Sequence, residues 1–185
     1  MLTGKKRLPG FSGEWEVKPW GSIAPLQRGF DLPTSQVKQG NYPVVYSNGV
    51  LNYHTTFQVE GPGVVTGRSG TIGNVHFVQK NFWPHNTSLW VTDFKSNDSK
   101  FVYYLLSSLR LERFATGSGV PTLNRNDVHA FAVSISPSPA EQSAIATVLS
   151  DMDADIAALE AKLAKARQLK QGMMQELLTG RIRLI

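Results

Sequence analysis

Apolar and polar residues follow two different patterns along the chain, and the change falls at Ser136–Pro139. Before this point, short apolar runs are separated by glycine-rich turns, a pattern that predicts strands. One stretch, Lys100–Ala115, places its apolar residues at helical spacing and predicts a helix. The expected strands are Glu14–Lys18, Tyr42–Tyr46, Gly63–Thr66, Ile72–Gln79, Thr87–Thr92 and Phe131–Ile135.

After Pro139 there is no proline, and apolar residues recur at alternating spacings of four and three. We expect Ser138 to cap a helix, with Pro139 in its first position and Glu141 completing a capping box. About 40 residues at 1.5 Å each make a helix of ~60 Å, which a small domain cannot cover. The pattern therefore favours a coiled-coil seam over a helix lying on its own domain. The seam, interrupted at Lys170, consists of Ile145, Leu149, Met152, Ile156, Leu159, Leu163, Ala166, Met173 and Leu177.

These patterns predict an α+β protein: a mixed α/β domain followed by a long C-terminal coiled-coil helix. We place the domain at residues 14–136, the helix at 137–179 and a tail at 180–185. Residues 1–13 are interpreted as the end of a preceding repeat, because Leu2–Leu8 (LTGKKRL) reappears as Leu178–Leu184 (LTGRIRL). Such repetition is typical of a tandem domain-plus-helix unit. A helix-ending glycine followed by basic residues also arises by convergence.

Charge is unevenly distributed along the chain. The net charge is +5, and residues 138–185 hold six basic and six acidic residues, so the whole excess lies in residues 1–137. A basic domain on a neutral helix suits a polyanionic partner, although ordinary surface charge gives the same total. Cysteine is absent, no apolar run approaches the roughly 20 residues that cross a bilayer, and the N-terminus lacks a signal-peptide core. We expect a cytoplasmic protein without a membrane partner.

Two loops rich in glycine and hydroxyl residues are candidates for contact with DNA, and the first of them is the stronger candidate. In Gly67–Gly73 (GRSGTIG) the glycines permit a tight hairpin, and Arg68, Ser69 and Thr71 place donors at its tip. An arginine can pair with guanine or with a phosphate, although a plain hairpin turn also explains the segment. The second loop, Gly117–Asn124 (GSGVPTLN), serves equally well as a turn into the last strand.

A third candidate follows the strand at 42–46. Asn48 carries an amide that can pair with adenine, yet Asn-Gly is also the commonest hairpin dipeptide. Trp83 and Trp90 are expected in the core rather than as stacking platforms, and Asn124–Asp127 is expected to be a helix start or turn. The full set of predicted DNA contacts is Arg28, Lys38, Tyr46, Ser47, Asn48, Arg68, Ser69, Thr71, Lys80, His85 and Ser118.

The sequence carries no recognisable catalytic motif. It has no glycine-rich phosphate loop, no HExxH pair and no Asn-Pro-Pro-aromatic tetrapeptide of the kind that adenine methyltransferases use. Asp151, Asp153 and Asp155 lie on the predicted helix, where alternate residues point in different directions. A solvated face is therefore expected rather than a metal site. We expect no catalytic residue, metal or cofactor in this chain.

Seven segments occur in a fixed order: 13–17 (GEWEV), 28–29 (RG), 42–44 (YPV), 67–73 (GRSGTIG), 117–123 (GSGVPTL), 136–142 (SPSPAEQ) and 174–180 (MQELLTG). In this order they make the chain similar to the DNA specificity subunit of type I restriction-modification enzymes. The resemblance covers essentially the whole chain, and the order of the segments with the LLTG ending makes it specific. The family's full-length form has two recognition domains and two conserved helices, whereas this chain has one of each.

The resemblance implies a specificity component that reads one half of a bipartite target in double-stranded DNA. It implies two partners: a methyltransferase subunit that carries S-adenosylmethionine and modifies adenine, and a restriction subunit driven by ATP and Mg. The helix would pair antiparallel with that of a second recognition unit, and in a homodimer two-fold symmetry predicts identical inverted half-sites. Two other classes stay open: a coiled-coil interaction protein whose domain binds protein or carbohydrate, and a nuclease.

Overall fold

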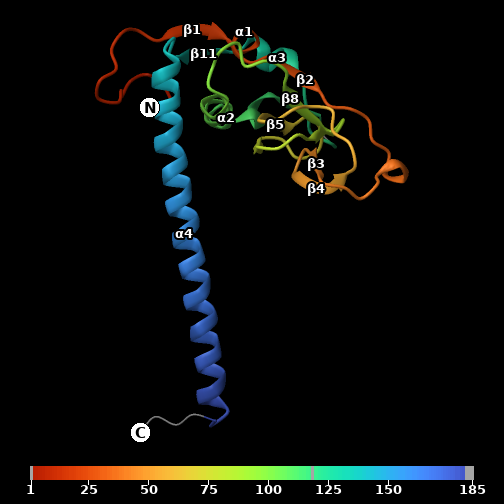
Figure 1. Ribbon diagram of the computed structural model, residues 1–185, viewed down its shortest axis with the longest axis vertical. Helices are drawn as coiled ribbons and strands as arrows, with labels where there is room; N and C mark the ends of the chain where they lie inside the picture. The colour runs from red at the N-terminus through yellow and green to blue at the C-terminus, as the bar shows by residue number, and fades with distance from the viewer. Residues whose placement is uncertain (1, 118, 182–185) are drawn as a thin grey trace. The chain divides into compact units, whose positions relative to one another are not determined.

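The computed structural model describes residues 2–117 and 119–181 (Figure 1). They group into two compact units, Met1–Ala146, called the body below, and Thr147–Ile185. The body carries the described strands, and a long C-terminal helix, α4 (Pro139–Leu178), begins in it and continues through the second unit. The α+β architecture with a long C-terminal helix, predicted from the sequence, is confirmed.

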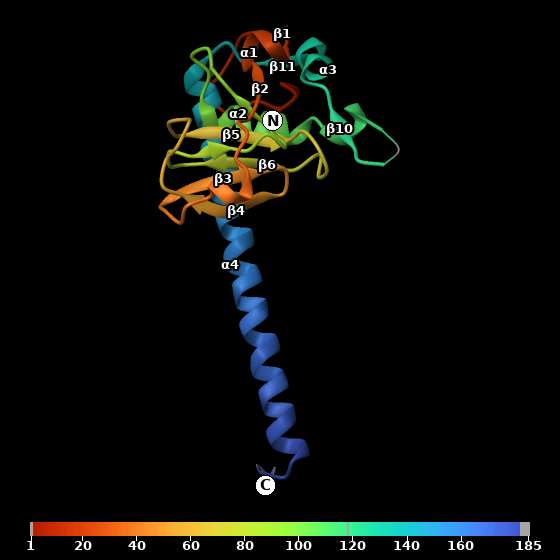
Figure 2. The same ribbon diagram turned by 90° about the vertical axis from the view of Figure 1, so that its right-hand side faces the viewer.

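The centre of the body is a four-stranded antiparallel sheet in the order β2-β8-β5-β6. Figure 2 shows the paired strands β5 and β6 side by side. Every residue of β5 is buried, which explains its continuous apolar run in place of an alternating one. Leu89 of β8 pairs with Arg28 on one side and Thr66 on the other, so β8 joins two distant parts of the sequence. The strands are β2 (Leu26–Arg28), β5 (Gly63–Gly67), β6 (Val75–Val78) and β8 (Ser88–Val91).

A three-stranded sheet in the order β4-β3-β7 packs beside the first. It consists of β3 (Tyr42–Tyr46), β4 (Gly49–His54) and β7 (Trp83–Pro84). Trp90 packs on the core cluster, and the indole of Trp83 donates to the carbonyl of Phe30, at 3.4 Å. Gly63 is required beside the cluster, because a Cβ there would lie 2.3 Å from the ring of Phe82. The core cluster contains Val45, Val65, Val78 and Phe82.

Short elements gather at the opposite end of the body from the β3–β4 hairpin, as both views show (Figures 1 and 2). The first and last strands of the body pair antiparallel there. His129 ties α3 to the central sheet, because its Nε2 accepts a hydrogen bond of 2.7 Å from the amide of Leu26. The elements are β1 (Glu16–Pro19), α1 (Trp20–Ile23), α3 (Arg125–Ala130) and β11 (Ala132–Ile135).

The helix predicted over 100–115 is shorter than expected. It forms α2 (Ser99–Ser108), whose N-terminal amide at Phe101 donates to the carboxylate of Asp98 at 2.8 Å. Arg110 then adopts a left-handed conformation with φ of 50°, which interrupts the α-helix. The remaining turn is a 3-10 helix, η2 (Leu111–Phe114), followed by β9 (Ala115–Thr116) and β10 (Thr122–Leu123). A second 3-10 helix, η1 (Thr34–Gln36), lies between β2 and β3.

The N-terminus of α4 is held by a buried carboxylate. Ser138 caps the helix as predicted, its hydroxyl accepting from the amide of Glu141 at 3.4 Å. Glu141 does not return the capping-box bond: the Ser138 amide donates to the hydroxyl of Ser136, at 3.2 Å. The Glu141 carboxylate instead accepts from the guanidinium of Arg7 (2.8 Å), the hydroxyl of Ser136 (2.5 Å) and the indole of Trp15 (3.2 Å). Arg7 and Trp15, which are distant in the sequence, thus take the place of the Ser138 amide as partners of the Glu141 carboxylate.

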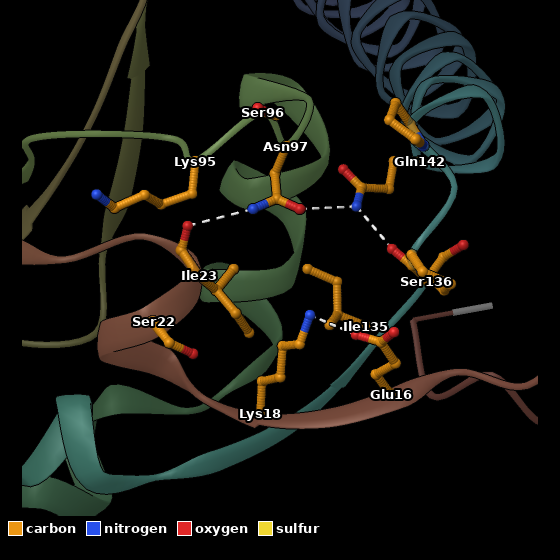
Figure 3. A pocket seen from close by; sticks show the side chains of 12 residues that line it. Glu16, Lys18, Ser22, Ile23, Lys95, Ser96, Asn97, Ile135, Ser136 and Gln142 are labelled. Carbon is orange, nitrogen blue, oxygen red and sulfur yellow. Dashed lines mark hydrogen bonds and ion pairs between the residues drawn. The ribbon is translucent and has the colours of Figure 1, made fainter.

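Gln142 adds a second buried set of bonds (Figure 3). Its side-chain carbonyl accepts from the amide of Asp98 at 2.9 Å, and its amide donates to the Asn97 side chain and the Ser136 carbonyl, each at 2.8 Å. Ile145, one turn further on, is only 1 % exposed. The first two turns of α4 are therefore part of the body's core, and the seam open to another helix starts at Leu149 instead of Ile145.

Further along, α4 presents large apolar side chains to solvent. Met152, Ile156, Leu159, Leu163 and Met173 are each 47 to 63 % exposed. These five are among the nine residues predicted for the coiled-coil seam, and the four from Met152 to Leu163 repeat at its spacing of four and three. That a second helix covers these exposed apolar residues of α4 stays a prediction.

The two copies of the Leu-Thr-Gly sequence share a backbone geometry. Gly4 has a φ of 71° and Gly180 a φ of 69°, the left-handed conformation that ends many helices. Gly4 packs on the indole of Trp15, where a Cβ would lie 3.0 Å from the ring. The C-terminal copy continues into residues 182–185, which lie outside the described part of the chain.

Candidate nucleic-acid interface

The two glycine-rich loops singled out from the sequence lie against each other. Gly70 donates its amide to the carbonyl of Pro121 at 3.0 Å, and Leu123 donates to the carbonyl of Arg68 at 2.8 Å. An isolated bridge joins Ser69 to Thr122. The hairpin between β5 and β6 is thereby fastened to the β9–β10 loop, and the pair forms one surface. Sequence spacing alone does not reveal this pairing.

The hairpin is also anchored at its base. The amides of Arg68 and Ser69 both donate to the carbonyl of Thr87, at 2.8 and 3.1 Å. Gly67 has no room for a side chain, because a Cβ would lie 1.8 Å from the carbonyl oxygen of Thr71. Thr71 itself is exposed near the tip. A fixed base with exposed polar residues at the tip is the geometry expected of a rigid recognition loop.

The segment after β3 is a tight hairpin, since Tyr46 pairs with Gly49. Ser47 is buried at its turn and lies against the GRSGTIG hairpin, 3.2 Å from where a Cβ of Gly67 would be. Asn48 is exposed at the tip. The hairpin interpretation of Asn-Gly therefore holds, and the turn still presents the Asn48 amide beside the other two loops.

His85 connects this hairpin to β2. Its ring stacks on that of Tyr46 with centroids 4.2 Å apart, and its Nδ1 lies 3.0 Å from the hydroxyl of Thr87. Burial lowers the pKa of His85 below its ordinary value, and the Arg28 guanidinium adds to the effect. The imidazole is therefore neutral near pH 7, with both a donor and an acceptor nitrogen. His76 behaves similarly, because burial lowers its pKa and leaves its Nε2 without a partner among the described residues.

Asp31 and Asn86, which no sequence motif singled out, also belong to this surface. Asp31 forms an ion pair with Arg28 at 2.8 Å, and the Asn86 amide donates to the same carboxylate. That hydrogen bond from Asn86, followed by the charge of Arg28, lowers the pKa of Asp31. Only the pairing of β2 with β8 brings these side chains together, so no local motif signals them.

The structure gathers most of the predicted DNA-contacting residues and leaves three aside. Arg28, Tyr46, Ser47, Asn48, Arg68, Ser69, Thr71 and His85 belong to the surface described above. The contacts described for Lys38 and Lys80 do not join them to it: the Lys38 amide bonds His54 at 3.1 Å, and Lys80 lies next to Gly61. Ser118 lies outside the described residues.

Among the described residues, no group of three or more histidines and acids is arranged to hold a metal ion. The Asp151, Asp153 and Asp155 side chains are exposed on α4. Within the same described ranges, no helix has the length and apolar character to span a bilayer.

The fold and this surface define a class of protein: a body that presents convergent polar loops and carries a long helix with an open apolar stripe. The family model of the type I restriction modification DNA specificity domain matches residues 12–168. The chain therefore belongs to this family. No curated protein sequence matches it.

Solved structures support the fold. The S subunit of a type I restriction-modification system from M. genitalium is 22% identical, with a TM-score of 0.72 over 95% of this chain and 48% of its own. The HsdS subunit from Thermoanaerobacter tengcongensis is 15% identical, with a TM-score of 0.60 over 93% of this chain and 46% of its own. The chain thus spans about half the length of the solved chains it matches.

Proposed function

We propose that this chain is a recognition module of a type I restriction-modification specificity subunit, which reads one half of a bipartite target in double-stranded DNA. The observation that carries the proposal is the convergence of three polar loops and Arg28 on one surface of the body. A rigid scaffold that presents several loops together is how proteins commonly build recognition sites. The positive net charge of residues 1–137 favours a polyanionic partner for that surface.

We further propose that α4 pairs antiparallel with the helix of a second recognition unit, in a homodimer of this chain. The support is the stripe of half-exposed apolar residues from Met152 to Met173. A symmetric pair reads identical half-sites in inverted orientation, separated by a spacer that neither body contacts.

The chemistry in this proposal belongs to other subunits. The chain directs a methyltransferase subunit, which carries S-adenosylmethionine, and a restriction subunit, which uses ATP and Mg, to the target. The assembly works in the cytoplasm, where the DNA is. We assign no catalytic residue and no resident cofactor to this chain.

Selection of bound duplexes from a random pool by the full-length chain tests the DNA-binding part. An enriched split palindrome is expected, and its affinity should fall steeply with salt because phosphate contacts release counterions. A body without affinity for duplex, bound instead to protein or carbohydrate, would establish the interaction-protein alternative. Metal-dependent nicking that persists through purification would establish the nuclease.

Light scattering tests the pairing. We expect a dimer that dissociates when Leu149, Ile156 and Leu163 are changed to glutamate. The matched control places glutamate at Ala154, Ala161 and Gln168, which the heptad pattern puts on the opposite face of α4. The pairing is refuted if the wild-type chain is monomeric, or if both sets of variants behave alike.

A further inference from the structure

Three arginines from separate parts of the sequence line one groove of the body. Arg28 ends β2, Arg68 follows β5 and Arg125 begins α3. All three line a cavity of about 440 Å³, together with Thr122 and Asn124. A second cavity, of about 530 Å³, shares Arg28 and Arg125 with the first. The two form one concave cationic surface, called the arginine groove below.

Backbone pairing sets the positions of these arginines. Arg28 is paired with Leu89 of β8, which itself lines the groove. The carbonyl of Arg68 accepts from the amide of Leu123 at 2.8 Å, two residues before Arg125. The groove is therefore built on paired strands, which reduces the entropy lost when a ligand binds.

The arginines outnumber their counter-charges. Arg28 is paired with Asp31 at 2.8 Å. The guanidinium of Arg68 reaches only the carbonyl of Asn86, at 3.5 Å, and Arg125 has no ion pair among the described residues. Two guanidiniums in one groove thus have no carboxylate partner, an arrangement that favours an anionic ligand.

We propose that the arginine groove seats the phosphodiester backbone of the duplex, with Arg125 as a contact that positions the body on the DNA. This inference rests on the proposed function and separates, within it, the residues that bind phosphates from those that read bases. The sequence indicated only a turn or helix start at Arg125. Phosphate contacts fix the register and orientation of a protein on DNA, while base edges carry the sequence. The groove adjoins the GRSGTIG hairpin through Arg68, so a strand held there lies beside the loops proposed to read bases.

Fluorescence anisotropy of the full-length chain tests the assignment with two labelled duplexes, one selected and one of random sequence, between about 50 and 200 mM salt. Arg125→Ala should weaken binding to both duplexes by the same factor. It should also reduce the slope of log K against log salt by about 0.9, the loss of one phosphate contact. Arg125→Lys keeps the charge and should restore most of the slope. Arg167→Ala removes the same charge from an exposed position on α4 and should leave the slope unchanged.

The outcomes separate the two proposals. If wild-type protein binds duplex and Arg125→Ala has the wild-type affinity and slope, the groove assignment falls and the recognition function stands. Weakening confined to the selected duplex would make Arg125 a base reader, which also overturns the backbone assignment. If the wild-type chain binds neither duplex at about 50 mM salt, the recognition function fails and the groove assignment fails with it.

Discussion

Removing Arg7 should destabilise the body strongly, because it leaves the buried carboxylate of Glu141 without its counter-charge. The Glu141 side chain is fully buried, whereas that of Arg7 is 22% exposed. Breaking a buried ion pair by removing one partner costs about 3–5 kcal/mol. The bonds from Ser136 and Trp15 survive in Arg7→Ala, so we expect about 3 kcal/mol, the lower end of that range. In a chain of this length, ~3 kcal/mol lowers Tm by roughly 6–12 °C.

Tryptophan fluorescence during urea and thermal unfolding measures this loss in the body. Lys6→Ala is the matched control, because it removes the same charge from an exposed side chain of the same segment. Glu141→Gln in the Arg7→Ala background removes the unpaired charge and should recover part of the loss. The coupling free energy between the two sites follows from the double-mutant cycle.

The pH dependence gives the same reasoning a second test. Burial raises the pKa of Glu141, but the bonds from Arg7, Ser136 and Trp15 outweigh it, so the pKa lies below its ordinary value. The depressed pKa stabilises the wild-type fold above the ordinary pKa of a glutamate, and this contribution is lost as pH falls through the folded value. Without Arg7 the pKa rises, so the deficit of Arg7→Ala should shrink in acid. A deficit no larger than that of Lys6→Ala, or one that is equal at neutral and acid pH, would refute the argument.

Three further predictions follow from the loops and the core. Asp31→Asn frees Arg28 from its ion pair and should tighten duplex binding roughly two- to fivefold at low salt; unchanged or weaker anisotropy would contradict it. Burial lowers the pKa of His76. The contribution of neutral His76 to stability is therefore complete above about pH 6.5 and is lost as pH falls through the pKa of the folded state. The urea concentration at the unfolding midpoint should be lower at pH 5 than at pH 7, and His76→Phe should reduce that difference. Gly63→Ala forces a methyl group against Phe82 and should cost about 1–3 kcal/mol, a loss that chemical denaturation would detect; wild-type stability would contradict it.

Local sequence signals located most of the regular elements. The strand at 42–46 has the predicted bounds, and those at 63–66, 87–92 and 131–135 differ by a residue or so at their ends. Each is an apolar run bounded by turn residues, which short-range physics determines. β2 and β4 were not predicted. β2 has three residues, two of them exposed, and β4 is exposed along most of its length, so neither shows a burial pattern.

Features that depend on distant partners escaped the sequence. The capping-box pattern predicted a local hydrogen bond for Glu141. Its buried carboxylate instead accepts hydrogen bonds from Arg7 and Trp15, because these charge-assisted bonds are stronger. Ile145 keeps the heptad spacing and yet packs in the body, because spacing defines a face of a helix and not what covers it. The family resemblance named these loops as separate segments, without saying which of them touch.

The sequence by itself determined the α+β class, the long helix with its apolar stripe, the family and the loops rich in glycine. These depend on periodicity, turn chemistry and motif order, which are properties of neighbouring residues. Only the tertiary structure decided that Arg28, Arg68 and Arg125 share one groove and that Asp31 and Asn86 lie beside them. Strand pairing through β8 and the β9–β10 loop brings these residues together. The register of the paired strands depends on the packing of the whole body, and the residues next to any one arginine do not determine it.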